Sequence, residues 1–342
     1  MRHAFLGTEL PIVQAPMAGS QRSRLAATVC AAGGLGSLPG AMFDAAGLRT
    51  ELQALAAQVR GAWNVNFFAH QPPAPDAAAE ARWRERLAPY YAELDIDPAG
   101  VPAGAGRQPF TAAMAEVLEE FQPAVVSFHF GLPAPELLAR VKARGAQVWS
   151  SATTVAEAVW LQQHGADVVI AQGLEAGGHR GLFLSHDLGL QSGTMALLPQ
   201  IVDAVSVPVV AAGGIADARG VQAALALGAA AVQVGTAYLG CDEAETSALH
   251  RAALRDLAAP TELTRLFTGR PARGIVNRLM RELGALSPDA PAFPTATAAL
   301  APLKAKAEAQ GLTDFTSLWS GQNRSGCNEP SAARLTRALA GL

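Results

Sequence analysis

A chain of 342 residues that is half apolar and only 16% charged can build one large core or two ordinary ones, which excludes a disordered protein. Its formal charge of −3 is spread over interspersed acids and bases without a run of Lys or Arg, so nucleic acid is not expected as a partner. The cysteines, Cys30, Cys241 and Cys327, lie far apart and outside any metal-ligand spacing, which predicts neither disulfides nor a metal site and fits a reducing cytoplasm.

Two features bear on a membrane. The N-terminus, MRHAFLGTEL, lacks the apolar core of a signal peptide. The run from Gly220 to Cys241 carries no charge and is long enough to raise the question of a membrane span. It contains Gln222 and Gln233, however, and changes at LGA from an alanine-rich helical half to a β-branched half. We therefore expect a helix followed by a strand, and no membrane partner.

The first predicted strand, Ile12–Ala15, ends in QAPMAGS. Here Pro16 removes a backbone donor and Gly19 permits close backbone approach, so a planar ring can lie over this segment. The second and third predicted strands are Leu35–Leu38 and Trp63–Phe68.

The third strand carries NVNFF, which places Asn64 and Asn66 on one face. A buried amide needs a hydrogen-bonding partner, so the pattern fits a residue that lines a site and a structural tie equally well. The following segment, from Gln71 to Pro109, is rich in Ala and Pro and predicts an elaborated loop with one helix.

Three later stretches, ARGAQVWSSAT, QHGADVVIAQG and ALGAAAVQVGT, share one pattern. In each, a helical pattern ends at a glycine and an apolar strand begins shortly afterwards. The strands are continuous apolar runs, which indicates a parallel sheet covered by helices on both faces. The remaining predicted strands are Ala124–Phe128, Gln147–Ser151, Val168–Ala171, Val207–Ala211 and Ala231–Val234, and predicted helices include Ala45–Val59, Pro135–Arg144, Val155–Gln163 and Asp217–Leu227.

The sixth strand leads into QGLEAGGHRG, in which Gln172 can offer a donor and an acceptor to an amide-like ring edge. His179 follows Gly177 and Gly178, and a side chain that titrates near neutral pH on so flexible a backbone is a candidate catalytic group. The alternative is a loop histidine bonded to a neighbouring carbonyl. His129, after the fourth strand, fits a functional and a structural role equally well.

The last two strands end in glycine. Gly213 and Gly214 follow the seventh strand in AAGGIAD, and Gly235 and Thr236 follow the eighth in QVGTA. Backbone N–H groups beside a helix start, together with a Thr hydroxyl, can bind a phosphate dianion, which barrels often hold after these two strands. Tight strand-to-helix turns are the alternative reading of the same glycines.

Eight strands alternating with helices predict an α/β fold, a (β/α)8 TIM barrel formed by residues 1–241, with a doubly wound sheet as the alternative. Residues 242–312 are charged, helical in pattern and interrupted by Pro, which predicts a small helical domain inserted after the eighth strand. Residues 313–342 predict a turn and a final helix that returns to the barrel.

A phosphate site at one end of the barrel mouth and amide side chains along it fit a nucleotide with a polar heterocycle, and flavin mononucleotide (FMN) has that outline. His179 is then expected to face the ring.

The motifs QAPMAGS, NVNFF, AQGLEAGGHRG, PVVAAGGIAD, QVGTAYL and TGRPARGIVN together resemble the class I nitronate monooxygenases, formerly called 2-nitropropane dioxygenases. The resemblance extends over nearly the whole chain. It implies an FMN barrel that oxidises alkyl nitronates, notably propionate 3-nitronate, with O2 to a carbonyl compound and nitrite, without metal or nicotinamide.

Carried over by matching motif, the resemblance implies that His179 is the catalytic residue, either as a hydrogen-bond donor to the nitronate or as a base toward a neutral nitroalkane. A pKa of about 6.5, as in model peptides, suits both tasks. The turn SGQNRSGC departs from the family's alanine-rich form, so no flavin contact is assigned to Gln322. With Gly178 and Gly213 from the pattern above, the expected flavin contacts are the Met17 backbone, Asn66, Gln172, Gly177, Gly178, Gly213, Gly214, Gln233, Val234, Gly235 and Thr236.

Two other functions remain open on the same scaffold. One is an FMN-dependent NADH:quinone reductase or enoyl-acyl carrier protein reductase, since fold alone does not fix function. The other is a barrel that binds FMN without turnover. A histidine in the barrel mouth argues against this second function.

Overall fold

The computed structural model describes residues 5–101 and 107–342. Its main sheet consists of eight parallel strands in the order β1-β9-β8-β6-β5-β4-β3-β2. The ends of this order meet, because Leu35 N donates to Ile12 O at 2.8 Å and Gln14 N donates to Leu35 O at 2.9 Å. The predicted (β/α)8 barrel is therefore confirmed, and the doubly wound sheet, which would leave two open edges, is wrong. The strands are β1 (Ile12–Gln14), β2 (Ser37–Pro39), β3 (Asn64–Phe68), β4 (Val125–His129), β5 (Gln147–Ala152), β6 (Val168–Gln172), β8 (Val209–Ala212) and β9 (Ala231–Val234).

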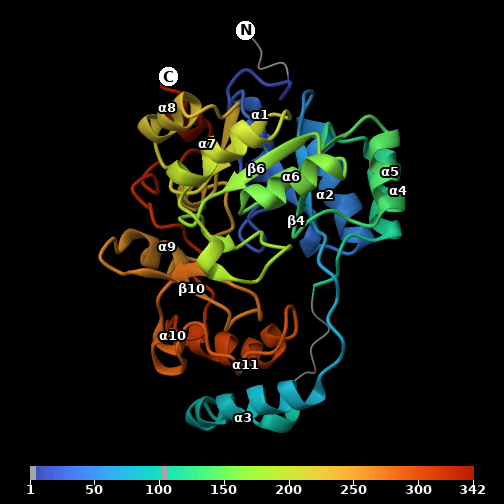
Figure 1. Ribbon diagram of the computed structural model, residues 1–342. Coiled ribbons are helices and arrows are strands. Elements are labelled where there is room, and N and C mark those ends of the chain that lie inside the picture. The colour runs from blue at the N-terminus through green and yellow to red at the C-terminus, as the bar shows by residue number, and fades with distance from the viewer. Residues whose placement is uncertain (1–4, 102–106) are drawn as a thin grey trace.

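Helices cover the outside of this barrel (Figure 1). Several begin where a side chain accepts from a first-turn N–H, as Asp44, Thr154 and Asp217 do. The last helix packs against α1 and α8 and completes the ring. The barrel helices are α1 (Ser23–Ala31), α2 (Ala45–Gln58), α4 (Ala112–Phe121), α5 (Pro135–Ala143), α6 (Val155–Gln163), α7 (Thr194–Ala204), α8 (Ala218–Ala226) and α12 (Ala332–Leu339), with short 3-10 helices at Gly40–Met42, Pro98–Gly100, Leu188–Leu190 and Thr236–Gly240.

The interior of the barrel is closed at the N-terminal ends of its strands. Trp149 is fully buried there, in one cluster with Val125 and Val168, which begin β4 and β6. A ligand can therefore enter only at the opposite end, where the strands finish. The uncharged run from Gly220 to Cys241 forms most of α8 and all of β9, and in the described part of the chain no helix has the length and apolar character to cross a membrane.

A second unit lies below the barrel in Figure 1. The segment after β9, for which a small helical domain was expected, contains two strands as well as helices. Neither strand is a continuous apolar run. β10 has one exposed, two partly buried and one buried residue, whereas β11 is wholly buried and includes the charged Arg273. The elements are α9 (Ala248–Arg255), β10 (Thr261–Thr264), β11 (Ala272–Ile275), α10 (Arg278–Leu283) and α11 (Ala296–Ala309).

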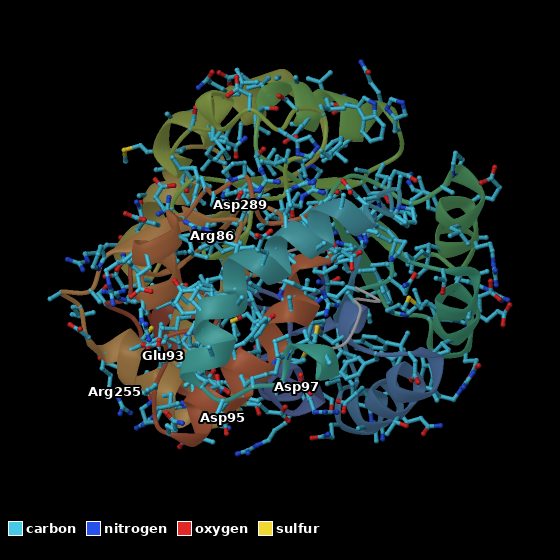
Figure 2. All side chains as sticks on the ribbon, turned by 90° about the horizontal axis from the view of Figure 1, so that it is seen from below. Arg86, Glu93, Asp95, Asp97, Arg255 and Asp289 are labelled. Atoms are coloured by element: carbon cyan, nitrogen blue, oxygen red, sulfur yellow. The ribbon has the colours of Figure 1, made fainter. Side chains whose placement is uncertain are left out.

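The long segment after β3 also joins this second unit. It carries α3 (Ala77–Glu93), the helix expected there, and α3 packs on α11. Trp83 Nε1 donates to Ala296 O at 3.2 Å, and the Tyr91 hydroxyl donates to Ala299 O at 2.6 Å. At the edge of this contact, Arg86 Nε lies 3.5 Å from Asp289 Oδ2 (Figure 2). The second unit is thus assembled from two distant parts of the chain.

Candidate active site

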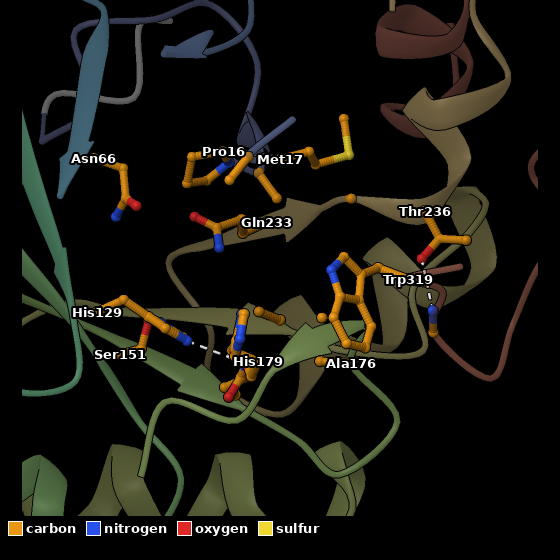
Figure 3. A pocket seen from close by; sticks show the side chains of 18 of the residues that line it. Pro16, Met17, Asn66, His129, Ser151, Ala176, His179, Gln233, Thr236 and Trp319 are labelled. Atoms are coloured by element: carbon orange, nitrogen blue, oxygen red, sulfur yellow. Dashed lines mark hydrogen bonds between the residues drawn. The ribbon is translucent and has the colours of Figure 1, made fainter. Parts of the chain in front are cut away.

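A cavity opens at the C-terminal ends of the barrel strands, where each of the eight strands contributes lining residues or is followed by them (Figure 3). The C-terminal tail closes one side with Trp319, Gly321 and Asn323. The sequence-predicted residues that line the cavity are Met17, Asn66, Gln172, Gly177, Gly178, His179, Gly213, Gly214, Gln233, Gly235 and Thr236. Val234 is the exception, because its side chain is 1% exposed in the core between strands and helices.

Gln233 has an unsatisfied oxygen. Its side chain extends from β9 into the cavity (Figure 3), and Oε1 is buried without a hydrogen-bond partner among the described residues. Leaving such an acceptor unpaired costs about 1–3 kcal/mol. An N–H group on the edge of a bound heterocycle would remove that cost, as the polar edge of a flavin ring would.

Gly235 lies next to open space. A Cβ on this residue would meet only Ala15 Cβ at 3.4 Å and Met17 Sδ at 4.0 Å, which are ordinary contacts, and its φ is −114°. Neither packing nor backbone conformation therefore requires glycine here. Gly213 and Gly214 differ, since their φ values of 120° and 72° favour glycine on conformational grounds alone. The space at Gly235 is thus the clearer sign of a ligand that approaches the backbone.

The glycines around His179 have different causes. A Cβ on Gly177 would overlap with Gly321 N, and one on Gly181 would lie 3.0 Å from His129 Cε1, so both residues are small because the chain packs closely there. Gly178 has a positive φ of 70° with no atom near the position of a Cβ. Close chain packing therefore explains Gly177 and Gly181, whereas Gly178 has the backbone conformation of a turn and leaves space beside it for a ligand.

The two predicted amides have unequal freedom. Asn66 Nδ2 donates to both oxygens of Ser127, at 3.2 Å to O and 3.0 Å to Oγ, and no described residue donates to its Oδ1. Gln172 uses both ends of its amide within the protein, since its Nε2 donates to His179 O at 2.9 Å and its Oε1 accepts from Gly181 N at 2.7 Å. Asn66 thus retains an acceptor for a ligand, whereas Gln172 holds the His179 loop in place.

His179 lies on β7 (Gly178–His179), a third strand of the small sheet, paired with β11. Its carbonyl accepts from His129 Nε2 at 3.1 Å as well as from Gln172. Its ring Nε2 lies 3.0 Å from Thr268 Oγ1, and the ring is 5.6 Å from that of Trp319. No described residue bonds the other ring nitrogen, Nδ1, so the imidazole has one anchored and one free side.

Burial lowers the pKa of His179 well below its usual range, and the charge of Arg107 acts in the same direction. The ordinary pKa of about 6.5 that was expected from the sequence therefore does not apply. The imidazole of His179 is uncharged near neutral pH. His129 is neutral for the same reason, because burial lowers its pKa to about 3. Its Nδ1 lies 3.0 Å from Ser151 Oγ, so both its ring nitrogens have protein partners and it is a structural tie.

Sequence reasoning did not single out Arg107, Thr268 or Trp319. Thr268 and Trp319 stand in TGRPARG and LWSGQ, stretches with a recognisable pattern but no visible link to His179. Arg107 lies in the segment interpreted as an elaborated loop, where nothing in the sequence marks it. Gln322 is exposed and contacts Glu175 O through its backbone N–H at 3.0 Å.

The fold and this cavity define a (β/α)8 enzyme with its site at the carboxyl ends of the strands. A family model described as nitronate monooxygenase matches residues 1–340. A nitronate monooxygenase from Pseudomonas aeruginosa is 42% identical over 345 residues, which covers 98% of this chain and 96% of that protein. The chain therefore belongs to the nitronate monooxygenase family of oxidoreductases.

Solved structures agree with this placement. A nitroalkane oxidase from Streptomyces ansochromogenes matches with a TM-score of 0.90 and 40% identity, covering 99% of this chain and 97% of that one. FabK from Thermotoga maritima matches with a TM-score of 0.73 and 26% identity, covering 98% and 93%. The agreement in both sequence and structure is thus greater with the nitroalkane oxidase.

Proposed function

We propose that the protein binds FMN in this cavity and oxidises alkyl nitronates, such as propionate 3-nitronate, with O2 to a carbonyl compound and nitrite. The observation that carries the proposal is the combination of an unpaired Gln233 oxygen and free space at Gly235 in the cavity that His179 lines. Membership of the family supplies the reaction class.

FMN bound here would contact residues at two ends of the cavity. The backbone N–H groups of Gly213, Gly214, Gly235 and Thr236 would hold the phosphate, and Gln233 and Asn66 would face the ring with their free amide oxygens. Thr236 Oγ1 accepts from Gly321 N at 2.9 Å, so the tail steadies the phosphate end. When bound, the flavin supplies an electron acceptor for the electron-rich nitronate and a reaction partner for O2.

His179 would bind the nitronate through Nδ1. The Thr268 hydroxyl has two possible acceptors, His179 Nε2 at 3.0 Å and Arg270 O at 3.4 Å. If it donates to the nearer one, Nε2, the proton of the neutral ring is on Nδ1 and can be donated to a nitronate oxygen. An imidazole with so low a pKa is a weak base, which supports this donor role over proton abstraction from a neutral nitroalkane. The rings of Phe68 and Trp319 lie 6.1 Å and 5.6 Å from His179 and restrict access of water to the same place.

The reductase alternative is tested by the choice of electron donor. Purified protein is expected to contain FMN, and anaerobic propionate 3-nitronate is expected to bleach the visible absorption of that flavin, whereas NADH leaves it unchanged. Bleaching by NADH with reoxidation by a quinone would instead identify a reductase. Protein that acquires no flavin spectrum on addition of micromolar FMN would contradict the proposal altogether.

The FMN site itself is tested by Gly235→Ala. Because the protein leaves room for this methyl group, the variant is expected to fold with the stability of the wild-type apoprotein. Crowding against a bound ligand costs about 1–3 kcal/mol, so FMN binding should weaken by about 5- to 150-fold in a fluorescence titration. Gly61→Ala is the matched control, since it adds the same methyl group on the surface with no atom near it. Equal FMN affinities in the two variants would place the flavin elsewhere.

A further inference from the structure

The charge of the cavity is unusually simple. Of the described residues that line it, Arg107 is the only one with an ionised side chain, and none is an Asp or a Glu. The two histidines, His129 and His179, are neutral because burial lowers their pKa values. A single positive charge therefore sets the electrostatic preference of the cavity, and it favours an anion.

Among the described residues, Arg107 has no partner for this charge. Its guanidinium lies over the Phe68 ring, 5.8 Å from the centroid, and forms no hydrogen bond or ion pair with any described residue. It is partly buried, and burial lowers its pKa, although an arginine stays protonated near neutral pH. Such a cation is costly to keep away from water unless an anion binds to it.

Two other arginines near the site donate hydrogen bonds within the protein. Arg180, fully buried, donates to Gly173 O at 2.6 Å and to Gln172 O at 2.8 Å. Arg270 donates to Leu182 O and lies 3.9 Å from the Phe130 ring centroid. Neither of them lines the cavity. Arg107 is thus distinguished by its place in the cavity and by a guanidinium that donates no hydrogen bond to any described residue.

Arg107 lies at the His179 end of the cavity. The Phe68 ring beneath it is 6.1 Å from the His179 ring, and after burial its charge is the largest influence on the pKa of His179. Gly235 and Thr236, the expected phosphate site, follow β9 on the other side of the barrel sheet from β3, which carries Phe68. An anion on Arg107 would therefore belong to the substrate held by His179.

We propose that Arg107 binds a carboxylate at the far end of the substrate, so that the enzyme selects short-chain nitronates that carry one. The inference rests on the proposed function, and adds to it the residue that determines specificity. A guanidinium presents a planar pair of N–H donors that matches a carboxylate, while His179 is left to bind the nitronate oxygens. The two groups of the substrate are then recognised by two different side chains.

Two nitronates of nearly equal shape test this assignment. Propionate 3-nitronate ends in a carboxylate, and 3-methylbutyl nitronate replaces that carboxylate by an uncharged isopropyl group. Arg107→Met should lower kcat/KM for propionate 3-nitronate by about 10- to 150-fold, mainly through KM, since a charged hydrogen bond contributes about 1.5–3 kcal/mol. The same variant should leave kcat/KM for 3-methylbutyl nitronate little changed. Arg107→Lys, which keeps a positive charge, should restore part of the kcat/KM that is lost for propionate 3-nitronate.

A binding measurement without turnover supplies the second readout. Succinate is an unreactive dianion of similar length, and calorimetry on the FMN-loaded protein should show that Arg107→Met weakens its binding by a similar factor. Arg86→Met is the matched control, because it removes the same charge from the surface of α3, outside the cavity. This control should change neither selectivity nor succinate affinity.

The opposite results are equally clear. Equal losses on both nitronates, or succinate binding that is indifferent to Arg107→Met, would show that Arg107 contacts the nitronate group or the flavin and would overturn the inference. If the wild type oxidises neither nitronate, the proposed function fails, and the succinate titration alone then decides whether Arg107 binds a carboxylate.

Discussion

His179 is held by its backbone and presents one side of its ring. Its carbonyl accepts two side-chain hydrogen bonds, from His129 and Gln172, and its Nε2 meets Thr268, so rotation of the loop and of the ring are both restricted. A donor fixed before the substrate arrives needs little reorganisation when charge shifts in the transition state. This geometry makes the imidazole the first target for substitution.

His179→Ala is expected to retain FMN and to lose turnover. FMN should remain because the expected phosphate contacts lie after β8 and β9, away from the substituted side chain. The loss of a charge-assisted hydrogen bond should lower kcat/KM for a nitronate by about 10- to 150-fold if the bond strengthens in the transition state. Steady-state rates on the nitronate and on its conjugate nitroalkane, with flavin content checked in each sample, measure the effect.

A loss confined to the neutral nitroalkane, for which general-base catalysis contributes about 10²- to 10⁴-fold, would identify the ring as a base. The pH profile adds an independent check. Since the lowered pKa keeps the ring neutral down to well below its ordinary range, kcat/KM for a nitronate should show no step near pH 6.5 that His179→Ala removes. A step at that pH would contradict the neutral imidazole.

At this scale the sequence predicts which residues gather but not how they are bonded. Eleven predicted residues line the cavity because parallel strands end on one side of a barrel, which the pattern of apolar runs already implies. Gln172 forms its hydrogen bonds with the His179 loop, whereas Asn66 keeps a free amide oxygen. This difference depends on interatomic distances, which a sequence pattern does not contain. Arg107 lies on a long connection, and its position is set by tertiary packing.

At the scale of elements, the barrel strands and their helices were predictable because buried parallel strands are continuous apolar runs preceded by glycine. The strand β7 was not predictable, because two residues in a glycine-rich loop have no strand pattern of their own. They form a strand only by pairing with β11. The small sheet thus joins the His179 loop to the second unit, and the second unit depends in turn on α3 for part of its core.

Trp83→Ala is expected to loosen the second unit while the barrel stays folded. Trp83 is 1% exposed and packs α3 on α11, and removal of such a side chain costs about 3–5 kcal/mol. Hydrogen exchange should therefore rise in α3, α11 and β11, and activity should fall because β11 positions His179. Leu161→Ala, in the fully buried layer between strands and helices, is the control, and it should raise exchange in α6 and its neighbours instead. Uniform exchange in Trp83→Ala would show that the molecule unfolds as one unit.

On the scale of the whole molecule, buried neutral histidines link stability to pH. Burial lowers the pKa of His70 and of His250 to about 4 and that of His129 to about 3, and it lowers the pKa of His179 well below its usual range. In the unfolded chain each has a pKa of about 6.5. Between these values the unfolded chain binds more protons than the folded one, so stability falls as pH falls from about 6.5 toward about 4.

His250→Gln is expected to weaken this dependence. Each such histidine contributes up to about 1.4 kcal/mol per pH unit to the slope of the unfolding free energy, and the glutamine cannot titrate. Its amide N–H can still donate to Trp319 O, which His250 Nε2 contacts at 3.1 Å, so the fold should persist. Urea denaturation at about pH 7 and about pH 5 measures the slope, and identical slopes in wild type and variant would exclude His250 as a contributor.

The docking of α3 on α11 also sets an order of events during synthesis. Trp83 and Ala296 are 213 residues apart, so at about 5–20 residues per second α3 leaves the ribosome about 10–40 s before its partner exists. The ring of helices around the barrel is also completed late, because its last member, α12, consists of residues 332–339. The nascent chain therefore carries an uncovered aromatic helix through most of translation, and the cavity is complete only after Asn323, its last lining residue, has been synthesised.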